Sequence, residues 1–176
     1  MTGTEFRSAY HEHKDAVYRF AWRMTSSPDA SEDIVQEVFL SLLRHPDRFD
    51  SAKGPLRPFL LGVARNLVLK RWRAENRWSA VVDEQFVAQP IAQPVDVTQG
   101  ETAGIVAAAV GSLPPLQREV LLLAEYEELS LDEIARAVEA EVGKVKARLH
   151  RARENLRRML ALLKGISVRT SHGTTK

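Results

Sequence analysis

The stretch that decides the fold reads LPPLQREVLLL over residues 113–123, LSLDEIARAV over 129–138 and, after EAEVG, KVKARLHRARENLRRML over 144–160. Ser130 is placed to cap the second of these segments, and Glu133 completes a capping box with it. In the third segment apolar residues recur every three or four positions, which predicts an amphipathic helix. Two helices joined by a short turn, the second strongly basic, are typical of a helix-turn-helix whose second helix enters the major groove of DNA.

The third segment carries cations on both flanks of its apolar stripe. The stripe consists of Val145, Leu149, Ala152, Leu156, Met159, Leu160 and Leu163. One flank holds Lys144, Arg148 and Arg151, and the other holds Lys146, Arg153 and Arg157. The structural alternative is an amphipathic helical hairpin with a solvated basic face. The capped preceding helix and the short turn favour DNA binding over that alternative.

Composition limits the classes of protein to which the chain can belong. Its 176 residues are enough for one or two domains, and a hydrophobic fraction of 44% is enough to form cores. The sequence contains no cysteine, which excludes disulfides and thiolate metal sites and agrees with a reducing cytoplasm. We expect no signal peptide, because no apolar run follows a basic start, and no membrane insertion, because no apolar stretch is long enough.

The charges are segregated along the chain although the net charge is only +2. Residues 65–77 contain five Arg and Lys residues against Glu75 alone, whereas residues 29–37 contain four acidic residues and no base. This separation indicates two different partners, one anionic and one not.

The hydrophobic pattern predicts an all-α chain of two small helical domains joined by a flexible linker. Apolar periodicity predicts helices at about 4–26, 29–44 and 58–77 ahead of the helix-turn-helix. In the second of these, the residues expected to pack inward are Ile34, Val35, Val38, Phe39, Leu42 and Leu43. We expect a first domain at 4–79, a linker at 80–104, a second domain at 105–164 and a disordered tail at 165–176. No alternating pattern is long enough to support a sheet.

The helix at 58–77 carries a second nucleic-acid signal. Its polar residues at i, i+4, i+7 and i+11 form one stripe, which consists of Asn66, Lys70, Arg73 and Arg77. Cations that hold phosphates, an amide that pairs with a base edge and an aromatic such as Trp72, on which an unstacked base can rest, suit strand-separated DNA. The structural alternative is that the tryptophan belongs to the core and that the arginines are simply solvated.

Three segments occur in an order typical of one family: SSPDASEDIVQEVFLSLL at 26–43, PFLLGVARNLVLKRWR at 58–73 and the helix-turn-helix quoted above. Over residues 5–78 and 105–163 the chain resembles the bacterial RNA polymerase sigma factors of the extracytoplasmic-function (ECF) group, which have only conserved regions two and four. In that family the first segment docks on the polymerase clamp, the second recognises and opens the minus-ten promoter element, and the third reads the minus-thirty-five element.

The resemblance implies roles for three sets of residues. The residues implied to face the clamp helices of core RNA polymerase are Asp33, Gln36 and Glu37, for which an acidic face that serves only solubility is the alternative. The residues implied at the minus-ten element are Asn66, Lys70, Trp72, Arg73 and Arg77, with the loop at 47–57 holding a flipped base. The residues implied at the minus-thirty-five element are Lys144, Lys146, Arg148, Arg151 and Arg153. The early members of this last set reach base edges, because a recognition helix enters the groove by its N-terminal end.

The resemblance also implies partners and a location. It implies core RNA polymerase, promoter DNA and an anti-sigma protein clamped across both domains. It implies action in the bacterial cytoplasm, with no membrane insertion, metal or cofactor, and a chain that is not an enzyme.

Several residues depart from the family pattern. Lys70 stands where an acidic residue is more usual, and Lys144 stands where Thr is usual. Phe59 replaces a usual Trp, and Glu141 replaces a better capping residue. Glu139 takes the place of a common Gly in the turn, so the preceding helix either runs on or adopts a different turn.

Two other classes of function remain as alternatives. A helix-turn-helix regulator that binds operators without entering the polymerase explains residues 113–163, but it leaves the acidic second helix and the stripe at 66–77 unexplained. An enzyme is the other alternative, and His11-Glu12-His13 is the stretch most like a metal site. On a helix, however, the i, i+2 spacing directs the two imidazoles apart. The sequence also lacks the HExxH, phosphate-loop and G-x-S-x-G motifs.

Overall fold

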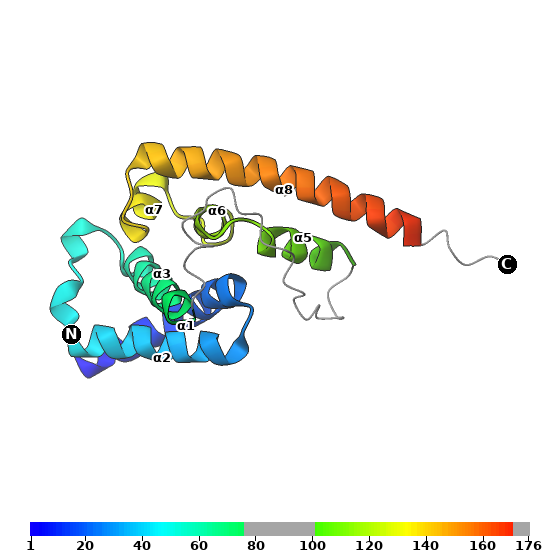
Figure 1. The fold of residues 1–176 in the computed structure, drawn as a ribbon. Helices are drawn as coiled ribbons and strands as arrows, with labels where there is room; N and C mark the ends of the chain where they lie inside the picture. The colour runs from blue at the N-terminus through cyan, green and yellow to red at the C-terminus, as the bar shows by residue number, and fades with distance from the viewer. Residues whose placement is uncertain (76–100, 171–176) are drawn as a thin grey trace.

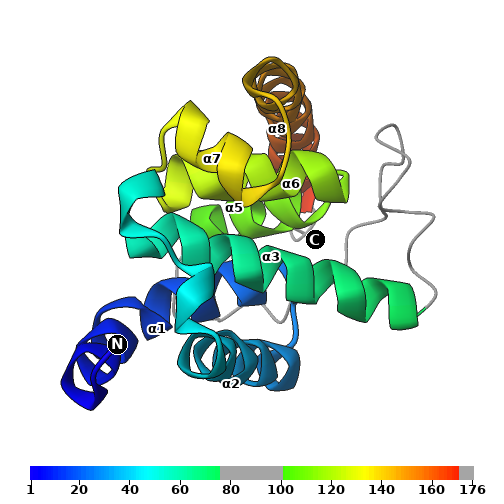
Figure 2. The same cartoon turned by 90° about the vertical axis from the view of Figure 1, so that its left-hand side faces the viewer.

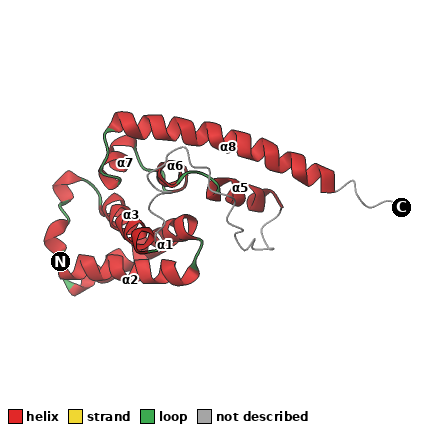
Figure 3. Ribbon diagram, in the orientation of Figure 1, coloured by secondary structure: helices red, strands yellow, loops and turns green. Residues whose placement is uncertain are grey.

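The computed structural model describes residues 1–75 and 101–170, and within these ranges all regular secondary structure is helical, as Figures 1 and 3 show. The N-terminal domain consists of α1 (Gly3–Thr25), α2 (Pro28–Arg44), the 3₁₀ turns η1 (Pro46–Arg48) and η2 (Ser51–Lys53), and α3 (Leu56–Ala74). The C-terminal domain consists of α5 (Glu101–Gly111), α6 (Pro115–Leu121), the π-helical turn η3 (Leu122–Tyr126), α7 (Leu131–Ala137) and α8 (Val142–Thr170). The prediction of an all-α fold is confirmed.

Local capping residues explain where the helices of the N-terminal domain begin. The Thr2 hydroxyl accepts a hydrogen bond from the Glu5 backbone N–H, and the Glu5 carboxylate accepts one from the Thr2 N–H, which forms a capping box at the start of α1. Ser26 adopts a left-handed conformation, with φ of 55°, that ends α1. Ser27 then caps α2, whose first residue is Pro28.

The core of the N-terminal domain lies where α1, α2 and α3 pack against one another. Its largest apolar members include Phe20 and Met24 from α1, Phe39 from α2 and Trp72 from α3. Five of the six residues that we expected α2 to bury are buried. Leu43 is the exception, because it remains 55% exposed on the outer face of α2.

The helix-turn-helix is formed by α7 and α8, and the predicted capping box is present. The Ser130 hydroxyl accepts from the Glu133 N–H, and the Glu133 carboxylate accepts from the Ser130 N–H. Helix α7 does not run on past Ala137, because Glu139 adopts the left-handed φ of 53° that glycine usually supplies at this place. Helix α8 continues to Thr170, six residues into the segment for which the composition predicts disorder.

The two domains pack against each other, which the sequence did not predict. Helix α3 contacts α7, and α1 contacts both α6 and η3. In Figures 1 and 2 the helices form successive layers, with α2 at one side, α3 in the middle and α8 at the opposite side. The buried apolar residues of the two domains form one continuous cluster across this boundary. The described parts of the chain therefore form one body.

Removing the N-cap of α7 tests whether the Ser130 hydroxyl stabilises the start of this helix. Ser130→Ala is expected to lower the free energy of unfolding by about 1 kcal/mol, because the Glu133 N–H loses its acceptor. Urea denaturation followed by circular dichroism measures the change. The control is Ser8→Ala, an exposed position within α1, which should leave the free energy of unfolding within about 0.5 kcal/mol. An equal loss in both variants would contradict the capping role.

Candidate nucleic-acid interface

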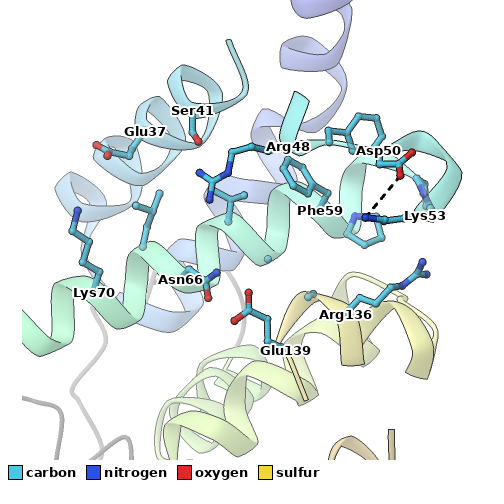
Figure 4. Close-up of a pocket in the computed structure, with 18 residues that line it drawn as sticks. Glu37, Ser41, Arg48, Asp50, Lys53, Phe59, Asn66, Lys70, Arg136 and Glu139 are labelled. Atoms are coloured by element: carbon cyan, nitrogen blue, oxygen red, sulfur yellow. Dashed lines mark ion pairs between the residues drawn. The ribbon is translucent and has the colours of Figure 1, made fainter. Parts of the chain in front are cut away.

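A cleft of about 740 Å³ opens where the N-terminal domain meets the turn of the helix-turn-helix (Figure 4). Helix α3 contributes Phe59, Asn66 and Lys70 to its wall. The opposite wall includes Arg136 and Glu139 from the end of α7 and the turn that follows it. Figure 4 shows the Glu139 carboxylate on the side of the cleft that faces Asn66. The cleft therefore joins the two parts of the chain for which the sequence predicts DNA binding.

The polar stripe of α3 is exposed as far as the structure describes it. Asn66, Lys70 and Arg73 all lie at the surface, whereas Arg77 lies outside the described residues. The first two line the cleft together with Phe59, so an amide, a cation and an aromatic ring follow one another along one wall of the cleft. This combination can hold a phosphate and an unstacked base at the same time.

The loop between α2 and α3 forms the end of the same cleft. Its two 3₁₀ turns present the side chains of Arg48 and Lys53, and Asp50 caps the second turn by accepting from the Ala52 N–H at 3.0 Å. The Phe49 ring lies 5.5 Å from the Phe59 ring, centroid to centroid, which makes an aromatic wall. The loop that we expected to hold a flipped base therefore lines the cleft with the cation of Arg48, the ring of Phe49 and an ion pair between Lys53 and Asp50 at 3.9 Å.

Trp72 does not take part in this surface, and the expectation that it meets DNA is corrected. Its side chain is only 2% exposed and packs in the core of the N-terminal domain. On α3 it lies roughly 120° around the axis from Asn66, because each residue advances a helix by about 100°. Trp72 is therefore a core residue, which is the structural alternative given for it above.

The acidic surface of α2 lies beside the stripe on α3. Asp33, Gln36 and Glu37 are all exposed, and Glu37 also lines the cleft. An Asp33 carboxylate oxygen lies 3.6 Å from Nη1 of Arg71 on α3, a partner that sequence proximity did not suggest. Leu40 and Leu43, one and two helical turns beyond Gln36, are exposed on the same face. The exposed face of α2 therefore combines acidic, amide and apolar side chains.

The cations of α8 differ in their surroundings. Lys144, Lys146 and Arg151 are exposed, and Arg148 is half-buried. Arg153 is exposed, and its Nε donates to a Glu125 carboxylate oxygen at 2.9 Å.

The face of α8 that points directly away from the core carries residues that the sequence reasoning missed. This face includes Gly143, Ala147 and His150, all of them exposed, and Nε2 of His150 lies 3.7 Å from a carboxylate oxygen of Glu154 on the same face. The helical period could have identified them, because they lie opposite the buried stripe of Val145, Leu149 and Ala152. Two small residues allow the helix backbone to approach a groove closely, and His150 can donate or accept a hydrogen bond at a base edge.

A buried ion pair connects the two domains. The Arg65 guanidinium on α3 donates through Nε and Nη2 to both carboxylate oxygens of Glu119 on α6, at 2.8 and 3.1 Å. The Glu119 side chain is fully buried and the Arg65 side chain is 11% exposed. Burial raises the pKa of the Glu119 carboxyl, while the hydrogen bond from Arg65 and the positive charges of Arg65 and Arg148 oppose that rise.

Three more arginine contacts cross the same boundary. Arg57 of the N-terminal domain pairs with Glu127, which is buried beyond η3. Arg118 of α6 is buried and donates to the carbonyl of Met24 at 3.1 Å, near the C-terminus of α1. The Arg23 guanidinium lies over the Tyr126 ring, 4.2 Å from its centroid. We refer to these three and the Arg65–Glu119 pair as the interdomain arginine contacts.

The remaining stretches that drew attention in the sequence form no site. His11 is exposed on α1, whereas the side chain of His13 is largely buried, so the two imidazoles do not converge. Within residues 1–75 and 101–170 no three acidic, histidine or cysteine side chains are grouped so that they could hold a metal ion. No described helix is both long enough and apolar enough to cross a membrane.

Comparison with known proteins identifies the family. Residues 9–78 match the model of sigma-70 region 2, and residues 103–156 match that of sigma-70 region 4. The chain is 31% identical to the ECF RNA polymerase sigma factor SigL of Mycobacterium tuberculosis over 153 residues, which cover 86% of each chain. The chain belongs to the ECF RNA polymerase sigma factors.

Other sigma factors agree with this assignment. The sigma factor SigW of Bacillus subtilis is 30% identical over 159 residues, which cover 84% of each chain. The match to SigE of Mycolicibacterium smegmatis, 31% identical, covers 85% of this chain and 59% of SigE. The solved structure of the sigma factor RpoE in complex with the anti-sigma factor NepR from Bartonella quintana has the same fold, with a TM-score of 0.72 and 24% identity. It covers 89% of this chain and 97% of that chain. The family assignment favours a sigma factor over an operator-binding regulator.

Replacing Trp72 distinguishes a core residue from a base platform in this ECF sigma factor. Trp72→Ala is expected to lower the free energy of unfolding by about 3–5 kcal/mol, because it leaves a cavity among α1, α2 and α3. Urea denaturation measures the loss, and Trp72→Phe, which refills most of the cavity, should lose clearly less. A Trp72→Ala variant with unchanged stability would show that the ring does not support the core.

Proposed function

We propose that this sigma factor directs core RNA polymerase to promoters and assists strand opening through the cleft between α3 and the loop at 46–55. The observation that carries the proposal is the grouping of Asn66, Lys70 and the Phe49–Phe59 wall in one cleft. Cations there neutralise the backbone, and the aromatic wall receives a base that has left the stack. Capturing an unpaired base offsets the few kcal/mol that flipping it costs. The chain itself breaks no covalent bond, so the proposed role is not enzymatic.

We assign reading of the minus-thirty-five element to the outward face of α8. Gly143, Ala147 and His150 approach the base edges in the major groove, while Lys144 and Arg151 beside them contact phosphates. Lys146 adds charge on the other side of this face, and Arg148 adds charge farther around the helix. Arg153 can contact DNA only after its ion pair with Glu125 breaks.

We assign docking on the polymerase clamp to the exposed face of α2. Asp33, Gln36 and Glu37 supply the polar contacts, and Leu40 and Leu43 supply apolar area that otherwise stays exposed to water. An anti-sigma protein is the second proposed partner, by analogy with RpoE, whose solved complex contains NepR. The proposed place of action is the bacterial cytoplasm, where the polymerase works.

The polymerase-docking face can be tested by removing its polar groups. A triple variant with Asp33→Ala, Gln36→Ala and Glu37→Ala is expected to weaken binding to core polymerase at least about tenfold, a loss of about 1.4 kcal/mol. Titration of labelled sigma factor with core polymerase measures the dissociation constant. Asp15→Ala, which removes an exposed acidic residue from α1, is the control and should bind normally. Normal binding by the triple variant would exclude this face.

The recognition helix can be tested by the salt dependence of promoter binding. The double variant with Lys144→Ala and Arg151→Ala is expected to reduce the slope of log affinity against log salt by about two, because two phosphate contacts are lost. The measurement uses reconstituted polymerase holoenzyme on a promoter fragment at several salt concentrations. Arg19→Ala, an exposed cation on α1, is the control, and the same change in slope for both variants would contradict a specific role for α8.

In vitro transcription tests the proposed function as a whole. Core polymerase with and without this chain is supplied with genomic DNA, and the 5′ ends of the transcripts are mapped. The expected result is a set of start sites that appears only with the chain and shares two upstream sequence elements. Binding to operators without association with core polymerase would instead identify the chain as a conventional regulator.

A further inference from the structure

The cleft between the two domains is large enough to hold a whole small molecule. Its volume of about 740 Å³ lies within the roughly 300–1,000 Å³ that small-molecule sites occupy. One wall comes from α3 and the loop at 46–55, and the other includes Arg136 at the end of α7 and Glu139 in the turn after it. The proposed function uses only the first wall. Arg136 and Glu139 therefore face the cleft without a part in promoter opening.

One end of the cleft is cationic. Arg136 lies against the loop, because a Cβ on Gly54 would stand 3.0 Å from its Nη1 and 3.3 Å from its Nη2. Its Nε donates to the Asp132 carbonyl of its own helix at 3.3 Å, and within the described residues its guanidinium forms no ion pair. Lys53 reaches the same end, where its Nζ lies 3.9 Å from an Asp50 carboxylate oxygen (Figure 4). A guanidinium and an ammonium group at one end of a cleft can hold phosphate oxygens through charge-assisted hydrogen bonds.

The middle of the cleft is aromatic. The Phe49 and Phe59 rings lie 5.5 Å apart, centroid to centroid, at an interplanar angle of 51°. Arg48 enters beside Phe59 from η1, and no ion pair among the residues that the structure describes engages its guanidinium. A planar heterocycle can stack on this aromatic wall while Arg48 contacts a phosphate chain attached to it.

The other end of the cleft offers a hydrogen-bond donor opposite a pair of acceptors. A Cβ on Gly62 would stand 3.1 Å from the Ala137 carbonyl oxygen, so the end of α7 comes directly against α3. This approach places Glu139 on the wall opposite Asn66 (Figure 4). The Asn66 Oδ1 accepts from Nη1 of Arg65 at 3.2 Å, so Asn66 presents its NH₂ group to a ligand. Guanine matches this arrangement, since its O6 accepts while its N1–H and N2–H₂ donate to a carboxylate.

We propose that the cleft is a binding site for a guanine nucleotide with at least two phosphates. The base stacks on the aromatic wall with its O6, N1 and N2 toward Asn66 and Glu139, and the phosphates reach Arg136 and Lys53. Glu37, another acidic residue of the cleft, lies at the end away from these cations (Figure 4). The site is complete only while the two domains pack against each other. This inference goes beyond the proposed function, because Arg136 and Glu139 take no part in that role.

Calorimetric titration of the free chain tests the site directly. The probes are GDP, ADP and inorganic pyrophosphate, each at the same pH and salt concentration. GDP is expected to bind at least about tenfold more tightly than ADP, because adenine presents an acceptor at N1 and has no N2 amino group for the carboxylate. Pyrophosphate is expected to bind at least about tenfold more weakly than GDP, because it lacks a base that stacks.

Two variants distinguish the phosphate end from the base end. Arg136→Ala should weaken the binding of GDP and ADP alike, by about tenfold, because both lose a charge-assisted phosphate contact. Glu139→Gln should instead remove most of the preference for GDP over ADP, because an amide accepts through only one oxygen. The matched controls are Arg157→Ala and Glu141→Gln, two exposed residues outside the cleft, which should bind both nucleotides as the unaltered chain does. Circular dichroism confirms that each variant is folded.

Three results would overturn the nucleotide site. They are no binding of GDP, equal binding of GDP and pyrophosphate, which would show an anion-binding surface without a base site, and variants that behave as their controls do. The outcomes also separate this proposal from the proposed function. A chain that selects promoters with core polymerase but binds no GDP would overturn the nucleotide site alone. A chain that binds GDP as expected but selects no promoter would overturn the proposed function alone.

Discussion

The ion pair between Arg65 and Glu119 is the contact on which the arrangement of this sigma factor depends. Moving these charges out of water costs several kcal/mol per ion, and only the paired geometry with both carboxylate oxygens satisfied offsets that cost. Arg65 lies in the middle of α3 and Glu119 lies in α6. Their pairing therefore sets where the helix-turn-helix rests on the N-terminal domain. It also sets which side chains face the cleft.

A buried ion pair of this kind fixes the relative orientation of the two domains more than it adds to the free energy of unfolding. Burial raises the pKa of the Glu119 carboxyl despite the nearby arginines, so the charged form of Glu119 is held at a cost. The second buried pair is incompletely satisfied, because Oε1 of Glu127 and Nε of Arg57 have no hydrogen-bond partner among the described residues. The charged contacts therefore define the orientation of the two domains, while the apolar cluster that is continuous across the boundary supplies buried area.

The parts of the fold that follow from local chemistry could be predicted from the sequence. The capping box of Ser130 and Glu133, the stripe on α3 and the basic flanks of α8 depend on residues within one or two helical turns. The interdomain arginine contacts could not be predicted, because Arg65 and Glu119 are 54 positions apart and a periodic pattern does not encode such a pairing. Trp72 was wrongly expected to contact DNA. Helix α3 packs against α1, α2 and α7, so a side chain on the flank of its polar stripe can be buried as readily as exposed. Glu139 shows the limit of residue preference, because it adopts a left-handed conformation that favours glycine while the Ala140 N–H bonds back to the Ala135 carbonyl at the end of α7.

Two contacts between the domains depend on the number of residues in the π-helical turn η3. Its wide ring, closed by the Glu127 N–H and the Leu122 carbonyl, holds one residue more than an α-helical turn would. Deleting that residue would rotate everything after it by about 100° about the helix axis. Tyr126 and Glu127 would then point away from Arg23 and Arg57. A chain that closes this helix with an ordinary α-helical turn would therefore lack the Arg23–Tyr126 and Arg57–Glu127 contacts, and Arg65 and Arg118 alone would supply the arginine contacts between its domains.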